Sequence, residues 1–253
     1  MLEIKDLQKS FQKDNGIESR VLKGLNLIIA DGEFVTVLGN NGAGKSTLFN
    51  LISGTILPNE GTIYLDHEDI TFMPEHKRSK FIGRVFQSPM KGTAPHLTVA
   101  ENMALAYGRQ NRKNFNWALT RPLKALFREK LAEAGMGLED KLDSKICDLS
   151  GGQCQVVALI MCTIKPPKLL LLDEHTAALD PRTAEDVLAF TSKIIAKDHL
   201  SALMITHHLE DAIAFGDRLV MMDDGVVAHD FAGAEKAELT TEQLRTLYHL
   251  RES

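Results

Sequence analysis

The chain has no apolar stretch long enough to cross a bilayer. A membrane-spanning helix needs about 18 or more consecutive apolar residues, whereas the longest apolar stretches here, such as residues 158–162, have the length of core segments. The first residues also lack the succession of basic, apolar and small residues that marks a signal peptide. We therefore expect a chain that does not cross a membrane by itself.

Cysteines are few, and their spacing argues against two kinds of site. Cys147, Cys154 and Cys162 form no C-x-x-C pair, and an odd number does not fit a disulfide framework. Cys154 and Cys162 should lie on one helix, which disfavours a metal site. We interpret all three as buried small hydrophobic residues and expect a reducing, cytosolic setting.

There is no excess of basic residues either. Lys and Arg number 29 and Asp and Glu 34, giving a net charge of −5. A general nucleic-acid-binding protein is usually basic, so we expect no nucleic-acid partner. With 253 residues, 44% of them hydrophobic, the chain predicts one large domain, or a domain with a subdomain. It has no internal repeat or low-complexity segment.

The strongest motif follows an expected buried strand at residues 34–38. It is a glycine-rich turn that opens a helix, and it matches G-x-x-x-x-G-K-[ST], the P-loop or Walker A pattern. Its residues are Gly39, Asn40, Asn41, Gly42, Ala43, Gly44, Lys45, Ser46 and Thr47. Glycines let successive backbone N–H groups point at an anion, and the helix start adds unpaired donors. Lys45 supplies a charge for the β- and γ-phosphates, and the Ser46 hydroxyl can bind Mg²⁺. The alternative is a glycine turn with a chance lysine, which the flanking apolar strand and helix disfavour.

A second motif is the apolar run 168–172 that ends in Asp173 and Glu174. An apolar strand closing on an acid is the Walker B pattern, in which Asp173 holds Mg²⁺ through its hydration shell. Glu174 could orient and deprotonate an attacking water. A charged strand terminus is the alternative, and it is weak beside a P-loop.

Leu149-Ser150-Gly151-Gly152-Gln153 opens an apolar helix expected at residues 154–164. Ser150 is a natural N-cap, and the two glycines expose backbone N–H groups where the helix dipole is positive. The segment therefore predicts a second anion site, which need not act on the same molecule's nucleotide.

Three isolated residues have two interpretations each. Phe11, near an edge strand, could stack on a purine ring, although a core phenylalanine is the simpler account. Gln87 ends the expected strand 83–87, at the sheet edge where ligands of open α/β sheets bind, but it could be a solvated loop residue. His207 ends the expected strand 203–208 and could bond a γ-phosphate or lie on the surface.

The remaining pattern predicts an α/β fold interrupted by helices. Residues 1–38 look β-rich, with Asp31-Gly32 as a hairpin signal. A strand at 62–66 and a short helix at 75–81 follow, then a Pro/Gly loop at 88–98. Helices at 99–107 and 118–134 should form a separate helical subdomain, and the basic clusters 109–113 and 121–128 its solvated faces. A helix at 184–197, another at 209–215, a terminal hairpin at 217–230 and a closing helix at 240–248 complete the chain.

Together these motifs closely resemble the ATP-binding subunit of an ABC transporter, over essentially the whole chain. Residues 149–153 match that family's signature, which is far more specific between a Walker A and a Walker B motif than either alone. The resemblance implies a P-loop NTPase of ABC type. Its RecA-like parallel-sheet core and N-terminal antiparallel β-subdomain would occupy residues 1–87 and 165–253. An inserted helical subdomain would occupy residues 88–164.

The resemblance also implies roles by position. Phe11 matches the adenine-stacking aromatic, Gln87 the Q-loop glutamine that senses Mg²⁺ and the partner, Asp180 the D-loop and His207 the switch histidine. Two subunits would dimerise head to tail, each ATP lying between the P-loop of one and the signature of the other. The implied cofactors are ATP and Mg²⁺. The catalytic residues would be Glu174, His207, Lys45 and Gln87; the nucleotide contacts Phe11, residues 39–47, Ser150, Gly151, Gly152, Gln153 and Asp180; and the metal ligands Ser46, Gln87 and Asp173.

The chain departs from the family pattern in places. The family commonly carries arginines after the signature glutamine, and the run 155–161 has none. His175 replaces the usual proline and Ala177 the usual serine. This version looks like a subset of bacterial uptake systems that work with an extracytoplasmic solute-binding protein, some of them for aromatic amino acids.

The expected function is therefore an ATPase that energises transport, in the direction of import, from the inner face of the cell membrane. Its partners would be a second copy, integral membrane permease subunits contacted by residues 88–98 and the following helix, and a solute-binding protein. A soluble ABC-type ATPase without a membrane partner, as in iron–sulfur cluster assembly, is the alternative. A small-molecule kinase has no use for residues 149–153.

Overall fold

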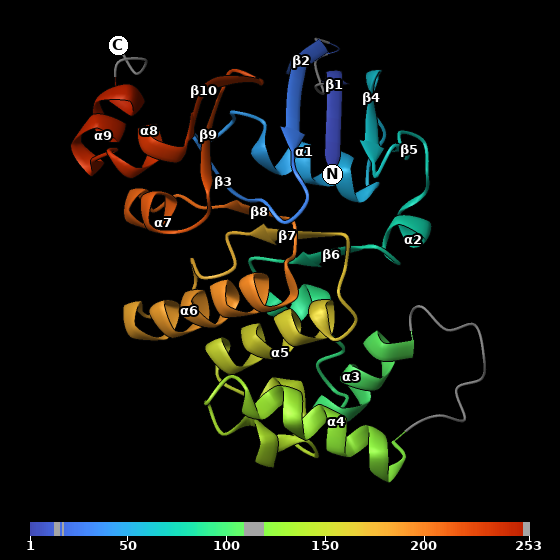
Figure 1. Cartoon of the computed structure of the whole chain (residues 1–253). Helices are drawn as coiled ribbons and strands as arrows, with labels where there is room; N and C mark the ends of the chain where they lie inside the picture. Colours follow the sequence, from blue (N-terminus) through green and yellow to red (C-terminus); the bar gives the residue numbers. More distant parts are fainter. Residues whose placement is uncertain (13–15, 17, 109–118, 250–253) are drawn as a thin grey trace.

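The chain folds into stacked layers (Figure 1). The computed structural model describes residues 1–12, 16, 18–108 and 119–249. An antiparallel sheet lies on helix α1 (Lys45–Ser53), and α1 lies on a second, mostly parallel sheet. Helices α5 (Gly151–Thr163) and α6 (Pro181–Asp198) cover the other face of that second sheet. Helices α3 (Val99–Gly108) and α4 (Arg121–Ala132) lie beyond them. This is the α/β architecture that the sequence predicts.

The first sheet has the strand order β2-β1-β4-β5. Its strands are β1 (Leu2–Gln12), β2 (Glu18–Ile29), β4 (Glu60–Leu65) and β5 (Glu68–Asp69). Leu2 pairs with both Ile29 and Leu65, and alternate residues such as Leu2 and Ile4 are buried. One face of this sheet therefore packs towards α1 and the other is open to solvent.

The prediction of a hairpin at Asp31-Gly32 is wrong. The chain does turn there, but β2 ends at Ile29 in the first sheet and the next strand, β3 (Phe34–Gly39), belongs to the second. A turn signal reports a local reversal and not which strands pair after it.

The second sheet has the order β10-β9-β3-β8-β7-β6. Besides β3, its strands are β6 (Ile82–Val85), β7 (Leu169–Asp173), β8 (Ala202–Ile205), β9 (Arg218–Asp223) and β10 (Val226–Ala232). Only β10 runs antiparallel, to β9, which confirms the predicted terminal hairpin. The central strands are almost entirely apolar because both of their faces are covered. In β7, Leu169 and Leu171 join the cluster around α1, whereas Leu170 and Leu172 join the cluster under α5 and α6.

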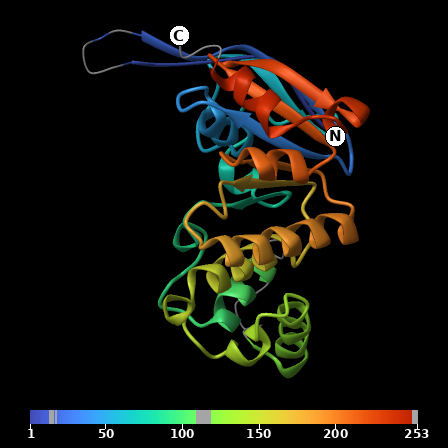
Figure 2. The ribbon, with the colours of Figure 1, turned by 90° about the vertical axis from the view of Figure 1, so that its left-hand side faces the viewer.

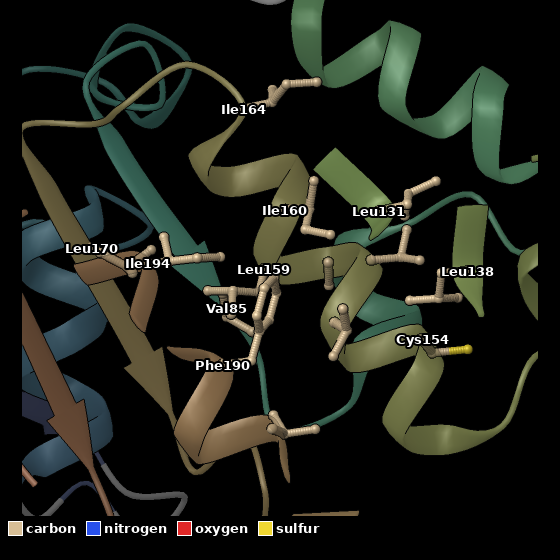
Figure 3. Packing of buried hydrophobic residues seen from close by; sticks show 14 of the residues in the cluster. Val85, Leu131, Leu138, Cys154, Leu159, Ile160, Ile164, Leu170, Phe190 and Ile194 are labelled. Carbon is tan, nitrogen blue, oxygen red and sulfur yellow. The ribbon is translucent and has the colours of Figure 1, made fainter. Parts of the chain in front are cut away.

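Helices α1 and α5 therefore lie on opposite faces of the second sheet, as the two perpendicular views show (Figures 1 and 2). Helix α5 packs tightly although it lacks the arginines common in the family. Its Leu159 and Ile160 are buried against side chains from β6, α4 and α6, among them Val85, Leu131 and Phe190 (Figure 3).

Shorter elements complete the chain. They are helices α2 (Glu75–Arg78), α7 (Leu209–Ala214), α8 (Gly233–Ala237) and α9 (Thr241–His249), and the 3-10 turns η1 (Pro89–Gly92), η3 (Leu138–Lys141) and η4 (Ile146–Asp148). Helix α6 begins earlier than predicted because Asp180 caps it and Pro181 occupies its first turn. Residue 118 and the basic cluster 109–113 lie outside the described residues. Arg121 and Arg128 are exposed on α4.

The sequence predicts that the three cysteines are buried, and the structure contradicts this for one of them. Cys154 is buried and Cys162 half-buried, but Cys147 is exposed, so the prediction that all three are buried is wrong for Cys147. It lies in the 3-10 turn η4, where its thiol donates to Asp148 Oδ1 at 3.7 Å and the side chain is open to solvent. Within the described part of the chain, no helix is long and apolar enough to cross a membrane.

The Arg78 side chain links the end of α1 to the turn that follows β5 of the first sheet. It is fully buried, and its guanidinium donates to the carbonyl oxygens of Leu51 and Ile52 at the end of α1 and of Thr71 and Met73 in the preceding turn, at 2.7–2.9 Å. The side chain thus satisfies carbonyls that a helix end leaves unpaired. Burial lowers the pKa of Arg78 to about 10.

Candidate functional site

The predicted motif residues meet at one edge of the second sheet. Parallel strands β3, β6, β7 and β8 all end there. The P-loop follows β3, Gln87 follows β6, Asp173 ends β7 and His207 follows β8. Side chains that lie far apart in the sequence are therefore gathered where ligands of open α/β sheets bind.

The P-loop forms a tight cradle that requires glycine at two positions. Gly39 and Gly44 have φ angles of +153° and +97°. A Cβ on Gly39 would lie 2.3 Å from the Met222 carbonyl oxygen, and one on Gly44 would lie 2.7 Å from a Leu22 methyl group. Neither position has room for a side chain, so the tight course of the loop depends on glycine at both.

Lys45 is drawn into this cradle. Its Nζ donates to the carbonyl oxygens of Gly39 at 2.5 Å and Asn40 at 3.0 Å, and the residue is only 5% exposed. Burial lowers the pKa of Lys45, against the opposing effect of the Glu174 and Asp173 carboxylates. The ammonium thus lies against the backbone of the P-loop, with two carboxylates nearby.

The Glu174 carboxylate contacts both Gln87 and His207, two of the three isolated residues that the sequence singles out. His207 Nε2 lies 2.6 Å from Glu174 Oε1, and Gln87 Nε2 donates to Glu174 Oε2 at 3.4 Å. Gln87 is exposed, as a loop residue would be, yet it reaches the site. Glu174 also has a φ of +47°, a left-handed conformation that costs a non-glycine residue about 1–3 kcal/mol and is common at functional sites.

Asp173 has a partner that sequence reasoning missed. Arg84, on β6, places Nη2 2.7 Å from Asp173 Oδ2, and both side chains are mostly buried. Its Nη1 donates to Asn50 Oδ1 at 2.8 Å and reaches Ser53 Oγ at 3.3 Å, both on α1. An arginine inside a short apolar strand was the available signal, because a charge in that position has to be paired.

Ser150 caps α5, as predicted. Its Oγ accepts from Gln153 N, and Gln153 Oε1 accepts from Ser150 N, both at 3.3 Å, which makes a capping box. The Gln153 side chain also bonds Met136 and Lys141. Its role as a nucleotide contact therefore stays a prediction.

The start of α5 packs against the start of α6. A Cβ on Gly152 would lie 2.1 Å from Thr183 Cγ2, so only glycine allows this approach. Asp180 caps α6 by accepting from Thr183 N at 3.1 Å, and hydrogen bonding from Thr183 lowers the pKa of the Asp180 carboxyl. The signature and the D-loop residue thus lie side by side, whereas Lys45 opens a helix on the opposite face of the sheet.

Phe11 is not a core residue. It is 41% exposed near the end of β1, with the Lys9 ammonium 5.2 Å from its ring centroid. The simpler account of Phe11 from sequence is therefore wrong. An exposed ring is available for stacking on a flat ligand.

His175 follows Glu174 and is fully buried. Its Nε2 lies 3.1 Å from Thr191 Oγ1 on α6, and the Thr191 hydroxyl itself donates to the Val187 carbonyl at 2.7 Å. The hydroxyl therefore accepts from His175, whose imidazole is neutral with its proton on Nε2. Burial lowers the pKa of His175 to about 4.

The residues at this edge of the sheet fit a nucleoside triphosphate and Mg²⁺. A glycine cradle with one ammonium suits the phosphates. The Ser46 hydroxyl, the Asp173 carboxylate and the Gln87 amide oxygen are the hard oxygen donors that Mg²⁺ prefers. No cluster of three or more His, Cys, Asp or Glu side chains able to hold a metal occurs among the described residues.

Known proteins are similar to this chain in sequence and in fold. Residues 22–177 match the family described as ABC transporter. The chain is 44% identical over 245 residues to a tyrosine transport ATP-binding protein of Clostridioides difficile, covering 96% of this chain and 97% of that one. It is 35% identical over 227 residues to a spermidine/putrescine import ATP-binding protein, PotA, of Spiroplasma citri, covering 90% of this chain and 60% of the relative.

Solved structures of ATP-binding cassettes have the same fold as this chain. A dimeric post-hydrolysis structure of the ATP-binding cassette MJ0796 bound to ADP and Pi superimposes with a TM-score of 0.79 at 30% identity, covering 92% of this chain and 98% of that one. The cbiO1 subunit from Clostridium perfringens superimposes with a TM-score of 0.77 at 27% identity, covering 99% and 94%. This chain therefore resembles ATP-binding subunits in sequence and in fold over nearly its full length, and the P-loop, the acid pair at the end of β7 and the capped helix α5 all lie within the matched region. The chain belongs to the ABC transporter family and is one of its ATP-binding, ATP-hydrolysing subunits.

Proposed function

We propose that the chain energises the import of a small solute, of the aromatic amino acid class, through separate membrane subunits at the inner face of the cell membrane. The observation that carries this proposal is the 44% identity, over nearly the full length of both chains, to a protein named for tyrosine transport. A second relative is named for spermidine/putrescine import. These names favour transport over the alternative of a soluble ATPase for iron–sulfur cluster assembly.

Nucleotide binding is assigned to the cradle and to Phe11. Phe11 stacks on the adenine, residues 39–47 surround the phosphates, and Lys45 leaves the carbonyls of Gly39 and Asn40 to bind the β- and γ-phosphate oxygens. Ser46, Asp173 and Gln87 would hold Mg²⁺. When bound, Mg²⁺ neutralises the charge that develops on the phosphate oxygens.

Hydrolysis is assigned to Glu174 and the two side chains that touch it. The Glu174 carboxylate orients a water and accepts its proton. His207 and Gln87 each hold one of its oxygens, at 2.6 and 3.4 Å, and so fix the direction in which the carboxylate points. His207 follows β8 at the same edge of the sheet, and we assign to its ring a hydrogen bond to the γ-phosphoryl group that is transferred to the water.

The second anion site acts on a partner copy's nucleotide. Lys45 and Ser150 begin helices on opposite faces of one sheet, so the serine-led helix start of one copy completes the P-loop of another. The dimeric MJ0796 cassette supports this arrangement. ATP then joins the two copies and hydrolysis separates them, which is a two-state engine.

Mixed dimers test this arrangement. Ser150→Arg and Lys45→Ala chains are each expected to lose hydrolysis, and their mixture should regain one working composite site. A mixture whose heterodimers form, by tag-based co-purification, but which hydrolyses no more ATP than either variant alone would contradict the in-trans site.

The membrane subunits are expected to dock in a groove beside residues 88–98. This groove has a volume of about 560 Å³ and is lined by Lys91, Thr93 and Ala94 from that loop and by Leu105 from α3. Leu105 is 43% exposed, and Met90 nearby in the loop is 40% exposed. Apolar side chains around a concavity are suited to a helical segment of a partner.

Reconstitution tests the transport class. Vesicles reconstituted with this chain and membrane permease subunits that co-purify with it should take up labelled tyrosine only when ATP is on the side of the membrane where this chain lies, and unlabelled phenylalanine should compete. Co-purification with polytopic membrane proteins supports transport. An active ATPase that associates with soluble assembly factors instead would support the alternative.

A further inference from the structure

Arg84 contacts both the proposed Mg²⁺ carboxylate and the wall of the groove. Its Nη2 lies 2.7 Å from Asp173 Oδ2, and the same side chain lines the groove together with Phe86, whose ring centroid lies 4.8 Å from the guanidinium carbon. Arg84 is thus shared between a chemical site and a surface that we assign to a partner.

One guanidinium nitrogen of Arg84, Nε, has no hydrogen-bond acceptor in the described part of the chain. Its Nη atoms are engaged by Asp173, Asn50 and Ser53, but Arg84 Nε is buried and has no hydrogen-bond acceptor among the described residues. A buried N–H without an acceptor is costly and is rarely retained without a role. An acceptor presented in the groove beside Phe86 would satisfy this N–H once the Arg84 side chain turns towards the groove and away from Asp173.

Asp173 cannot serve two cations equally well. The carboxylate is 16% exposed and Arg84 is 12% exposed, so little water screens their attraction. A guanidinium in contact with Asp173 both occupies one carboxylate oxygen and repels a divalent cation that approaches the other. Withdrawal of Arg84 from Asp173 should therefore strengthen Mg²⁺ binding.

We propose that Arg84 is a positioning residue that competes with Mg²⁺ for Asp173, and that a membrane-subunit segment in the groove relieves this competition by accepting a hydrogen bond from Arg84 Nε. The inference rests on the proposed function, since it takes Asp173 as a Mg²⁺ ligand and the groove as the docking site. Because binding linkage is reciprocal, Mg²⁺–nucleotide should strengthen docking by the same factor.

The first test measures Mg²⁺ affinity without hydrolysis. Binding of a fluorescent ADP analogue is followed while Mg²⁺ is titrated. Arg84→Met should lower the half-saturating Mg²⁺ concentration by about fivefold or more, the order of one partly screened charge. Arg84→Lys keeps the charge and should stay near the wild-type value. Arg84→Gln retains polar contacts to Asn50 and Ser53 and supplies the same neutral test if the methionine variant does not fold.

The direction of the shift decides the outcome. An unchanged or higher half-saturating Mg²⁺ concentration in the neutral variants would mean that Arg84 only orients Asp173, and it would overturn the proposal. An equal shift in Arg84→Lys would overturn the role of charge. A wild-type chain that binds no nucleotide at any Mg²⁺ concentration would contradict the proposed function instead.

The second test adds the membrane subunits in lipid nanodiscs. Assembly should lower the half-saturating Mg²⁺ concentration of the wild-type chain and leave that of Arg84→Met unchanged, because the variant has no competing cation to withdraw. An equal shift in both assembled chains, or no shift in the assembled wild type, would overturn the link to the groove.

Discussion

His175 should make the stability of this protein depend on pH in a defined window. The imidazole is fully buried, donates to Thr191 and has a pKa lowered to about 4, against 6.5 for an exposed histidine. In the unfolded chain the same group takes up a proton near pH 6.5. Between these two values the unfolded state binds more protons than the folded state.

The sign and size follow from proton linkage. Stability rises with pH wherever the unfolded state binds more protons, so this histidine costs nothing above about pH 7 and destabilises the fold as pH falls from 6.5 towards 4. At about 1.36 kcal/mol for each tenfold difference in proton affinity, the loss reaches roughly 2 kcal/mol near pH 5 and about 3 kcal/mol below pH 4.

The assay is urea unfolding of wild type and His175→Gln at about pH 7 and pH 5. Glutamine still offers an N–H to Thr191 but does not titrate, so the fall in unfolding free energy between the two pH values should be smaller by about 2 kcal/mol in the variant. His76→Gln is the matched control, since His76 is exposed on α2 and its loss should leave most of the pH dependence in place.

Equal pH dependence in wild type and His175→Gln would refute this reasoning. So would an NMR titration in which the His175 ring protonates in the folded chain near pH 6.5, because a water-accessible imidazole would then have replaced the buried, neutral one.

Three further predictions concern the site and its support. Glu174→Gln should keep ATP binding, reduce hydrolysis by about a hundredfold or more and accumulate an ATP-bound dimer in size-exclusion chromatography; hydrolysis at the wild-type rate would remove Glu174 from its role. Phe11→Ala should weaken ATP binding by about tenfold, the order of one lost stacking contact, while Phe11→Trp retains it; equal affinities by calorimetry would contradict the stacking role. Arg78→Met should destabilise the fold by about 3 kcal/mol or more, because four carbonyl groups lose their donor. Arg20→Met, on an exposed side chain, should change urea unfolding by less than about 0.5 kcal/mol, and similar losses in the two variants would contradict the capping role of Arg78.

The sequence predicts the P-loop and the acid pair well because each depends on a short, continuous segment. A buried strand, a glycine turn and a helix beginning at Lys45 are all encoded within about twenty residues, and the left-handed Gly54 ends α1. The α/β fold class follows from the same alternation of strands and helices. Ser150 and its capping box are equally local.

Contacts between distant segments are harder to predict. The pairing of Arg84 with Asp173 depends on β6 and β7 being neighbours, and the bond from His175 to Thr191 depends on how α6 lies across the sheet. Nothing in the sequence near either residue specifies its partner. The hairpin expected at Asp31-Gly32 fails for a related reason, since strand pairing across the two sheets is set by packing and not by the turn.

The position of Lys45 has a consequence for which anions can enter the loop. Its ammonium is held by two carbonyl oxygens, so a ligand gains the lysine's charge only by displacing both of them. A singly charged anion such as chloride offers little in exchange, whereas a polyphosphate brings several charged oxygens at once. Lys45 therefore favours ligands that carry several negative charges, and this selection by charge does not depend on contacts with the base.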